Sequence, residues 1–267
     1  FIVIIDRVSG SACKLPVPTR LNVKTARKRI NMIVWSSRMK QKPTHFVSIP
    51  MNNQQIIEKF NSFKQGVLED CEANGVEESI FILPTKLHIT IGVTALMDNE
   101  ERLHASKLLQ NAADEIIRPS IKPYHPLKIR LKGISYMNDD PSQINVLYAD
   151  VEEENAPAGV LQTLVDDIFK YFIKAGFMQN NFNRDDVKLH VTIMKTAYRG
   201  KSQNGGKDSD DIRRNRKQTF DGTKILEKYK DYDFGVMELE NIYLSQMHSG
   251  LGENGYYQNT CVVSCAP

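Results

Sequence analysis

Apolar residues recur every three or four positions in five stretches of the chain, with polar residues between them. This is the spacing of the buried face of an α-helix. At the start of the third stretch, Asp98 is followed three residues later by Glu101, which is the pattern of a capping box at a helix N-terminus. The spacing predicts helices over residues 22–40, 55–73, 99–117, 161–176 and 224–229.

Other runs alternate apolar and polar residues or are short and continuously apolar, as β-strands are. Because helices and strands mix along the chain and several strands are joined as hairpins, we expect an α+β fold with largely antiparallel sheets. Residues 138–141, Asn-Asp-Asp-Pro, predict the turn of one hairpin. The predicted strands cover residues 1–5, 45–49, 87–93, 127–131, 144–151, 188–194, 236–245 and 256–264.

The pattern changes near residue 43, so we expect a division into residues 1–42 and 43–267. Residues 1–45 hold ten Lys or Arg residues and one acidic residue, whereas the remainder holds 25 basic and 31 acidic residues. A basic segment ahead of an acidic body favours a polyanionic partner, and the solvated face of a helix explains the charge equally well. Polar residues 200–219 predict a mobile loop within the second part.

Composition sets broad limits on the class of protein. A chain with 41% hydrophobic and 25% charged residues is typical of a soluble globular protein. No run approaches the roughly 18 consecutive apolar residues of a membrane span, so we expect no membrane partner. The four cysteines include no Cys-x-x-Cys pair, so the spacing of a zinc site is absent from the sequence and reduced thiols are expected.

The most informative feature is a hexapeptide that occurs twice. Residues 86–91 read Lys-Leu-His-Ile-Thr-Ile and residues 188–193 read Lys-Leu-His-Val-Thr-Ile, so five of the six positions are identical. Residues two apart on a strand share a face. His88 should therefore point the same way as Thr90, and His190 the same way as Thr192, while the apolar residues between them enter the core. Two such strands side by side would bring two imidazoles and two hydroxyls together.

These four side chains suit phosphodiester chemistry that needs no metal or cofactor. Histidine titrates near neutral pH, so one imidazole can take a proton from a ribose hydroxyl or water while the other protonates the leaving oxygen. The hydroxyls of Thr90 and Thr192 can hold the phosphate oxygens as charge develops. Histidines satisfied on half-buried strands are the structural alternative. A metal site is disfavoured, because two imidazoles lack the third ligand of a typical catalytic zinc.

Four further side chains are candidates for binding the substrate. Lys195 and Arg199 follow the second motif closely and can contact phosphate, with solvation at the surface as the alternative. Phe220 and Tyr257 are candidates for stacking on a base, with packing in the core as the alternative.

Two basic residues are set aside, because we expect their strands to turn them away from the histidines or to the strand edge: Lys86 and Lys188. The histidines outside the two motifs have no partner motif and are expected to be structural: His45, His104, His125 and His248.

The paired His-hydrophobic-Thr motifs, about a hundred residues apart, resemble the signature of the two-histidine phosphoesterases. The resemblance covers about residues 44–264. It implies a two-lobed fold in which each lobe gives one motif strand to a central cleft, and it implies a catalytic role for the motif residues. Further support comes from Lys-Pro-Thr-His-Phe at 42–46, Pro-Thr-Lys-Leu-His at 84–88, Gly-Ile-Ser-Tyr-Met-Asn-Asp-Asp-Pro at 133–141, Phe-Asp-Gly at 220–222 and Gly-Tyr-Tyr at 255–257.

The resemblance also implies an N-terminal context and a set of partners. In similar proteins a K-homology RNA-binding domain precedes the phosphoesterase, and residues 1–42 resemble only the last strand and helix of such a domain. The Gly-x-x-Gly loop that clamps a nucleic-acid backbone in these domains is absent from this segment. The implied partners are RNA or single-stranded nucleic acid, and the subunits of a nuclear complex that contains a helicase and serves transcription coactivation and alkylation-damage repair.

Three functions are open at this point. The first is a metal-independent phosphodiesterase that acts on RNA or single-stranded nucleic acid with His88 and His190 as the acid–base pair. The second is a non-catalytic module that binds RNA or a nucleotide within the complex, and the third is a scaffold subunit. Turnover that survives EDTA would indicate the first, and binding without turnover would indicate the second.

Overall fold

The computed structural model describes residues 41–71, 75–180, 186–199 and 219–267. Contacts divide the chain into two units, Phe1–Gln41 and Lys42–Pro267, and nearly all described residues belong to the second. The predicted N-terminal strand and helix, the segment that resembles a K-homology domain, and nearly all of the loop predicted over 200–219 lie outside the described residues.

The second unit is built on one sheet of eight strands in the order β6-β3-β4-β5-β2-β1-β7-β8. Every strand pair among the described residues is antiparallel, which confirms the predicted α+β fold. The strands are β1 His45–Pro50, β2 His88–Thr94, β3 Lys128–Tyr136, β4 Val146–Glu153, β5 Val191–Lys195, β6 Asp233–Glu238, β7 Asn241–Gln246 and β8 Asn259–Ser264.

The two motif strands lie side by side at the centre of the sheet, where Ile89 of β2 pairs with Val191 of β5. Outward from β2 follow β1, β7 and β8, and outward from β5 follow β4, β3 and β6. We call these the first half-sheet and the second half-sheet. Each half-sheet therefore begins at the centre with one histidine motif, in agreement with the two lobes that the resemblance implies.

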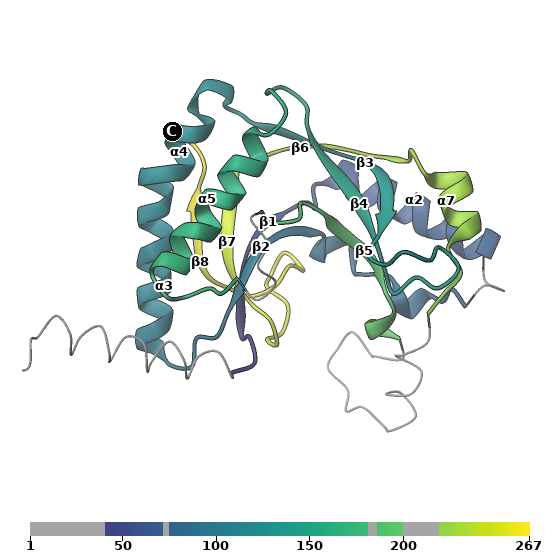
Figure 1. The fold of residues 1–267 in the computed structure, drawn as a ribbon, viewed down its shortest axis with the longest axis horizontal. Coiled ribbons are helices and arrows are strands. Elements are labelled where there is room, and N and C mark those ends of the chain that lie inside the picture. The colour runs from purple at the N-terminus through teal and green to yellow at the C-terminus, as the bar shows by residue number, and fades with distance from the viewer. Residues whose placement is uncertain (1–40, 72–74, 181–185, 200–218) are drawn as a thin grey trace, which may run out of the picture. The chain divides into compact units, whose positions relative to one another are not determined.

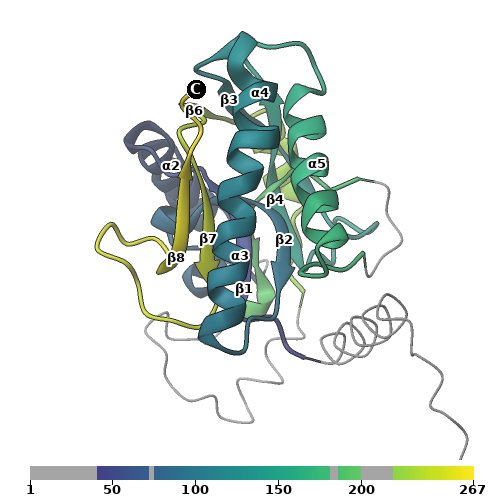
Figure 2. The same ribbon diagram turned by 90° about the vertical axis from the view of Figure 1, so that its left-hand side faces the viewer.

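Helices pack at both ends of this sheet. Figure 1 places α3, α4 and α5 on one side of the unit and α2 and α7 on the other, and in the turned view of Figure 2 α3 lies in front of β7. None of the described helices is long and apolar enough to cross a membrane. The α-helices are α2 Gln54–Cys71, α3 Asn99–Ala112, α4 Arg118–Ile121, α5 Val160–Lys174 and α7 Thr223–Tyr229, with a π-helical turn at Ala113–Ile117 and 3-10 turns at Glu78–Ile80, Pro84–Lys86, Lys122–Tyr124 and Thr196–Tyr198.

Two helices pack on the half-sheet to which their preceding strand does not belong. Helix α2 follows β1 of the first half-sheet but packs on β6 of the second. Helix α5 follows β4 of the second half-sheet but packs on β2 of the first. The apolar stripe predicted for α2 is the face that it buries, and its members are Ile56, Phe60, Phe63, Val67 and Cys71. Because α2 and α5 each pack on the half-sheet opposite to that of the preceding strand, the two half-sheets share one hydrophobic core.

The predicted capping box is present at the start of α3. The side chain of Asp98 accepts a hydrogen bond from the backbone N–H of Glu101 at 2.8 Å. The carboxylate of Glu101 in turn accepts from the N–H of Met97, also at 2.8 Å, so it reaches one residue further back than in the usual box. Both interactions satisfy N–H groups that have no partner inside the helix.

The single strand predicted over 236–245 is wrong. The chain forms β6 and β7 there, and these pair with different neighbours, β6 with β3 and β7 with β1 and β8. Between them Leu239 is buried and donates its N–H to the carbonyl of Leu127, and the chain passes from the second half-sheet to the first. No Gly or Pro marks this passage in the sequence, so the local pattern contains no sign of the break.

Candidate active site

The pairing of β2 with β5 puts the two motifs together on one face of the sheet. Ile89 and Val191 are directly opposite and fully buried, and residues directly opposite in an antiparallel pair point to the same face. The residues on either side of them therefore point to the other face. These are the four predicted catalytic residues, all half-buried: His88, Thr90, His190 and Thr192. One detail differs from the prediction, because β5 begins at Val191 and His190 stands just before it.

Both imidazoles are oriented by the same hydrogen bond. Nδ1 of His88 lies 2.7 Å from the carbonyl oxygen of Lys86, and Nδ1 of His190 lies 2.7 Å from that of Lys188. A carbonyl oxygen can only accept, so each Nδ1 carries a proton and the neutral ring keeps its lone pair on Nε2. The two histidines thus have the same tautomer, and each Nε2 is left for another partner.

The threonine hydroxyls complete the set. Within the described part of the chain, neither Thr90 nor Thr192 uses its hydroxyl in a hydrogen bond to the protein. A hydroxyl can both donate and accept. Two hydroxyls and two Nε2 atoms therefore share one face and suit a ligand rich in oxygen atoms.

Aromatic rings surround the two histidines unequally. The ring of His88 lies 5.0 Å from Phe46, 5.6 Å from Tyr257 and 6.2 Å from Tyr256, measured between centroids. The ring of His190 has one such neighbour, Tyr148 at 5.4 Å. His88 is therefore the more enclosed of the pair.

The tyrosines that contact the two histidines come from different places in the fold. Tyr148 stands on β4 opposite Thr192, whereas the matching position on β1, opposite Thr90, is held by Ser48. Ser48 is buried and hydrogen-bonds the hydroxyl of Tyr256 at 2.9 Å. The tyrosine beside His88 that corresponds to Tyr148 is Tyr257, from the segment ahead of β8.

This environment shifts both titrations in the same direction. The pKa of His88 is lowered to about 4, chiefly by burial; the hydrogen bond to the Lys86 carbonyl opposes the shift, and the charges of His190 and Lys86 contribute to it. Burial also lowers the pKa of His190, with smaller effects from Lys188 and Lys195. The charged form of an imidazole is penalised by burial and by nearby positive charge. His88 is therefore neutral at pH 7, as a general base must be.

Lys86 and Lys188 lie beside the histidines, so the expectation that they turn away is wrong. The ammonium of Lys86 lies 4.8 Å from the centre of the Tyr257 ring, and that of Lys188 lies 4.5 Å from the centre of the Tyr148 ring. Each lysine precedes its histidine by two residues, and Lys86 ends the 3-10 turn Pro84–Lys86 rather than standing on β2. The repeated hexapeptide, which includes both lysines, was the signal that could have identified them.

The four predicted substrate-binding residues fall into two groups. Tyr257 contacts His88, and Lys195 lies close enough to His190 to lower its pKa. Arg199 is committed elsewhere, because its guanidinium pairs with a carboxylate oxygen of Glu77 at 2.9 Å and donates to a backbone carbonyl. Phe220 is 1% exposed in the core, so the alternative of core packing holds for it and stacking on a base does not.

His45 is structural, as predicted. It is 3% exposed and lies between two hydroxyls, with Nδ1 2.8 Å from Thr44 Oγ1 and Nε2 3.1 Å from Thr260 Oγ1. Burial lowers its pKa to about 4, and the charge of Arg102 adds to the effect.

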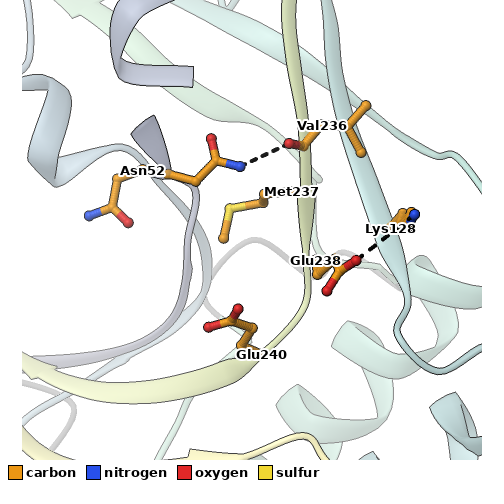
Figure 3. A pocket seen from close by; sticks show the side chains of 7 residues that line it. Asn52, Lys128, Val236, Met237, Glu238 and Glu240 are labelled. Carbon is orange, nitrogen blue, oxygen red and sulfur yellow. Dashed lines mark hydrogen bonds and ion pairs between the residues drawn. The ribbon is translucent and has the colours of Figure 1, made fainter. Parts of the chain in front are cut away.

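A separate pocket of about 540 Å³ opens between the residues that follow β1 and the β6–β7 connection. Asn53 donates to the carbonyl of Val236 at 2.9 Å. Lys128 pairs with Glu238 at 3.9 Å (Figure 3). With Glu240 also in its wall, the pocket has more negative than positive charge and does not suit a phosphate. Among the described residues, no group of three or more His, Cys, Asp or Glu side chains is arranged to hold a metal ion.

Comparison with known proteins agrees with this geometry. Residues 43–264 match the family model described as "AKAP7 2'5' RNA ligase-like domain", and the chain belongs to this family. Among individual relatives, "Activating signal cointegrator 1 complex subunit 1" of Mus musculus is 35% identical over 234 residues, which are 85% of this chain and 64% of that protein. The chain therefore spans just under two thirds of the length of this relative.

Two further likenesses are more distant. "Uncharacterized protein C15D4.13c" of Schizosaccharomyces pombe is 27% identical over 222 residues, which are 80% of this chain and 91% of that protein. The crystal structure of TT0787 of Thermus thermophilus superposes with a TM-score of 0.49 at 15% identity and covers 83% of this chain and 97% of its own.

Proposed function

We propose that this chain is a phosphodiesterase that acts on RNA or single-stranded nucleic acid by metal-independent acid–base catalysis with His88 and His190. One observation carries the proposal. The imidazole of His88 on β2 and that of His190 just ahead of β5 have the same carbonyl bond at Nδ1, so both Nε2 atoms are available on one face together with two hydroxyls.

The chemistry follows from these groups. Nε2 of neutral His88 takes the proton of a ribose 2′-hydroxyl or of water as its oxygen forms a bond to phosphorus. The bond from phosphorus to the leaving oxygen breaks, and protonated His190 gives its proton to that oxygen. The hydroxyls of Thr90 and Thr192 donate to the non-bridging oxygens, where charge develops.

The assembly in which the chain works is part of the same proposal. The mouse relative is named as a subunit of the activating signal cointegrator 1 complex, and the family is described as RNA ligase-like. These names support a place in a complex of that kind. A nuclear location, a helicase among the partners and roles in transcription coactivation and alkylation-damage repair belong to the same proposal and follow only from the family resemblance of the sequence.

Turnover of labelled oligonucleotides in EDTA tests the catalytic proposal. The panel ends in 3′-phosphate, 2′,3′-cyclic phosphate or free hydroxyl, and the variants are His88→Ala, His190→Ala and both together. We expect each single variant to lose roughly two to four orders of magnitude in rate. The matched control is His104→Ala, because this histidine is exposed on α3 and lies outside both motifs.

Three results would contradict the proposal. If EDTA abolished turnover and a divalent metal restored it, the metal-independent mechanism would be wrong. If the wild type bound oligonucleotides without turnover and His88→Ala bound them more weakly, the chain would be a recognition module. If His104→Ala lost as much activity as the motif variants, the loss would not report on the site.

A further inference from the structure

The lysines that precede the two histidines differ from the described lysines that form ion pairs. Lys64, Lys128 and Lys228 each pair with a carboxylate. Neither Lys86 nor Lys188 has a carboxylate partner among the described residues, and each places its ammonium over a tyrosine ring instead. A cation–π contact holds an ammonium in position but leaves its charge without a counter-ion.

The positive charge of these lysines adds to a site that is already positive. The charges that shift the pKa of His88 are those of His190 and Lys86, and those that shift the pKa of His190 are Lys188 and Lys195. Burial also lowers the pKa of Lys86, which reflects the cost of holding this unpaired ammonium partly out of water. An anion bound near these groups would relieve both the repulsion and the cost of burial.

The arrangement of lysine, tyrosine and histidine is built twice by different means. In the second half-sheet the tyrosine is Tyr148 on β4, whereas in the first it is Tyr257 from the segment before β8, because Ser48 holds the matching strand position. If the arrangement were only a by-product of the sequence repeat, both tyrosines would come from matching strand positions. They come from unmatched positions, which indicates that the contact between lysine and tyrosine has a function in both half-sheets.

The two lysines lie at opposite ends of the site. Each stands three residues before the central pair Ile89–Val191, and β2 and β5 run antiparallel. Residues 86–87 and 188–190 stand outside the strands, so about 3.3 Å per residue sets only an upper limit of about 20 Å on the distance between the two backbone positions, with the histidines between them. The two lysines therefore approach the histidines from opposite directions, as the phosphates on either side of a scissile linkage would.

We propose that Lys86 and Lys188 are substrate-positioning residues that bind the backbone phosphates on either side of the scissile one, so that the preferred substrate is an internal linkage of a single-stranded oligonucleotide. This inference rests on the proposed phosphodiesterase activity and names the substrate class of the same site. The tyrosine rings hold the ammonium groups, and the histidines act on the phosphate between them.

Matched substrates separate the flanking phosphates from the scissile one. The first is a dinucleoside monophosphate, which has one linkage and no flanking phosphate. The second is a hexamer of DNA with one ribonucleotide at the third position, which places the reactive linkage at the centre. Two further hexamers carry the ribonucleotide at the first or the fifth position, so that flanking phosphates lie on one side only.

We expect the wild type to prefer the central hexamer over the dinucleoside monophosphate, mainly through a lower KM. Lys86→Met and Lys188→Met should each reduce kcat/KM on the central hexamer about tenfold, and each should affect only one of the two hexamers with a terminal ribonucleotide linkage. On the dinucleoside monophosphate, which has no flanking phosphate, the double variant should lose much less kcat/KM than on the central hexamer. Its slope of log(kcat/KM) against log salt should fall by about 1.4, the value for two phosphate contacts on a single strand.

The control is Lys107→Met, which removes an exposed lysine on α3. If the double variant lost activity equally on all four substrates, or kept the preference for the hexamer, the inference would be wrong. If the wild type turned over none of them, the proposed activity itself would have failed. In that case, fluorescence anisotropy of the central hexamer tests phosphate binding by Lys86 and Lys188 independently of turnover. The double variant must bind the hexamer at least tenfold more weakly than the wild type, while Lys107→Met binds normally.

Discussion

At the scale of single residues, the two histidines differ in surroundings although their hydrogen bonds are the same. His88 has three aromatic neighbours, whereas His190 has one. The pKa of the more enclosed His88 is about 4. The bond at Nδ1 fixes the tautomer of both rings. Orientation is therefore equal at the two positions, and the environment alone distinguishes the proton acceptor from the proton donor.

This difference predicts an acidic optimum for kcat/KM. The base His88 loses activity as the pH falls through about 4, because its Nε2 becomes protonated. The acid His190 loses activity as the pH rises through a pKa that lies below the usual 6.5. A bell-shaped profile with its maximum between these values is expected in a stopped assay on oligonucleotides.

Lys86→Met provides the check on this profile. Removing a positive charge beside His88 should raise its pKa and move the acid limb to higher pH. NMR titration of the histidine Cε1–H signals reports that shift directly. An acid limb that stayed in place, or a His88 signal that titrated above 6.5, would contradict the assignment of His88 as base.

The sequence predicted the motif residues well because strand periodicity is local. Alternation placed the two imidazoles and the two hydroxyls on one face without knowledge of the fold. The rings of Phe46 and Tyr148 were not candidates, because they reach the site through strand pairing rather than through spacing in the sequence. The role of the aromatic residues depends on tertiary contacts that no local pattern contains.

At the scale of elements, β2 depends on a close approach to α5 and the residues that follow it. A Cβ atom at Gly92 would lie 2.5 Å from Sδ of Met178 and 3.0 Å from the ring of Phe169. Met178 is 1% exposed and is enclosed by other core residues. The absence of a side chain at this position lets the helix pack against the strand that carries the first motif.

Gly92→Ala is therefore expected to lower the free energy of unfolding by about 1–3 kcal/mol. Urea denaturation followed by circular dichroism measures the change. The matched control is Gly250→Ala, because a Cβ there meets no atom within 4 Å. Equal stability of the two variants would show that β2 and α5 do not pack as closely as described.

Prediction of the elements succeeded where the pattern was long and failed where the chain changed neighbours. The helices α2, α3 and α5 begin within two residues of their predicted starts, because apolar stripes and the Asp98 cap are encoded locally. The passage from β6 to β7 has a continuous strand pattern, and the exchange of partner strands at Leu239 depends on pairing with distant strands.

At the scale of the whole molecule, one continuous core joins both half-sheets. Two neutral histidines belong to this cooperative unit, and the pKa values of His45 and His88 are both about 4. Unfolding would return them to about 6.5, so the unfolded chain takes up protons first as the pH falls. Their contribution to stability is complete above pH 6.5 and is lost between pH 6.5 and about 4.

His45→Gln is expected to reduce this acid sensitivity. His45 is 3% exposed, and a shift of this size corresponds to about 3 kcal/mol between the two ends of the window. Thermal unfolding at pH 7.5, 5.5 and 4.5 should therefore show a smaller fall in Tm for the variant than for the wild type. His104→Gln serves as the control, and an equal fall in all three proteins would mean that His45 takes up its proton without unfolding.

The reciprocal exchange of α2 and α5 has a consequence for how the chain could be divided. A cut in the connection between β4 and α5 would leave each fragment with two strands of each half-sheet and with helices that pack on the other fragment's strands. Neither fragment would hold a complete apolar layer, and each would carry one of the two motif histidines. Each fragment alone would therefore be inactive, and activity would return only when the two fragments reassociate, as in a split enzyme.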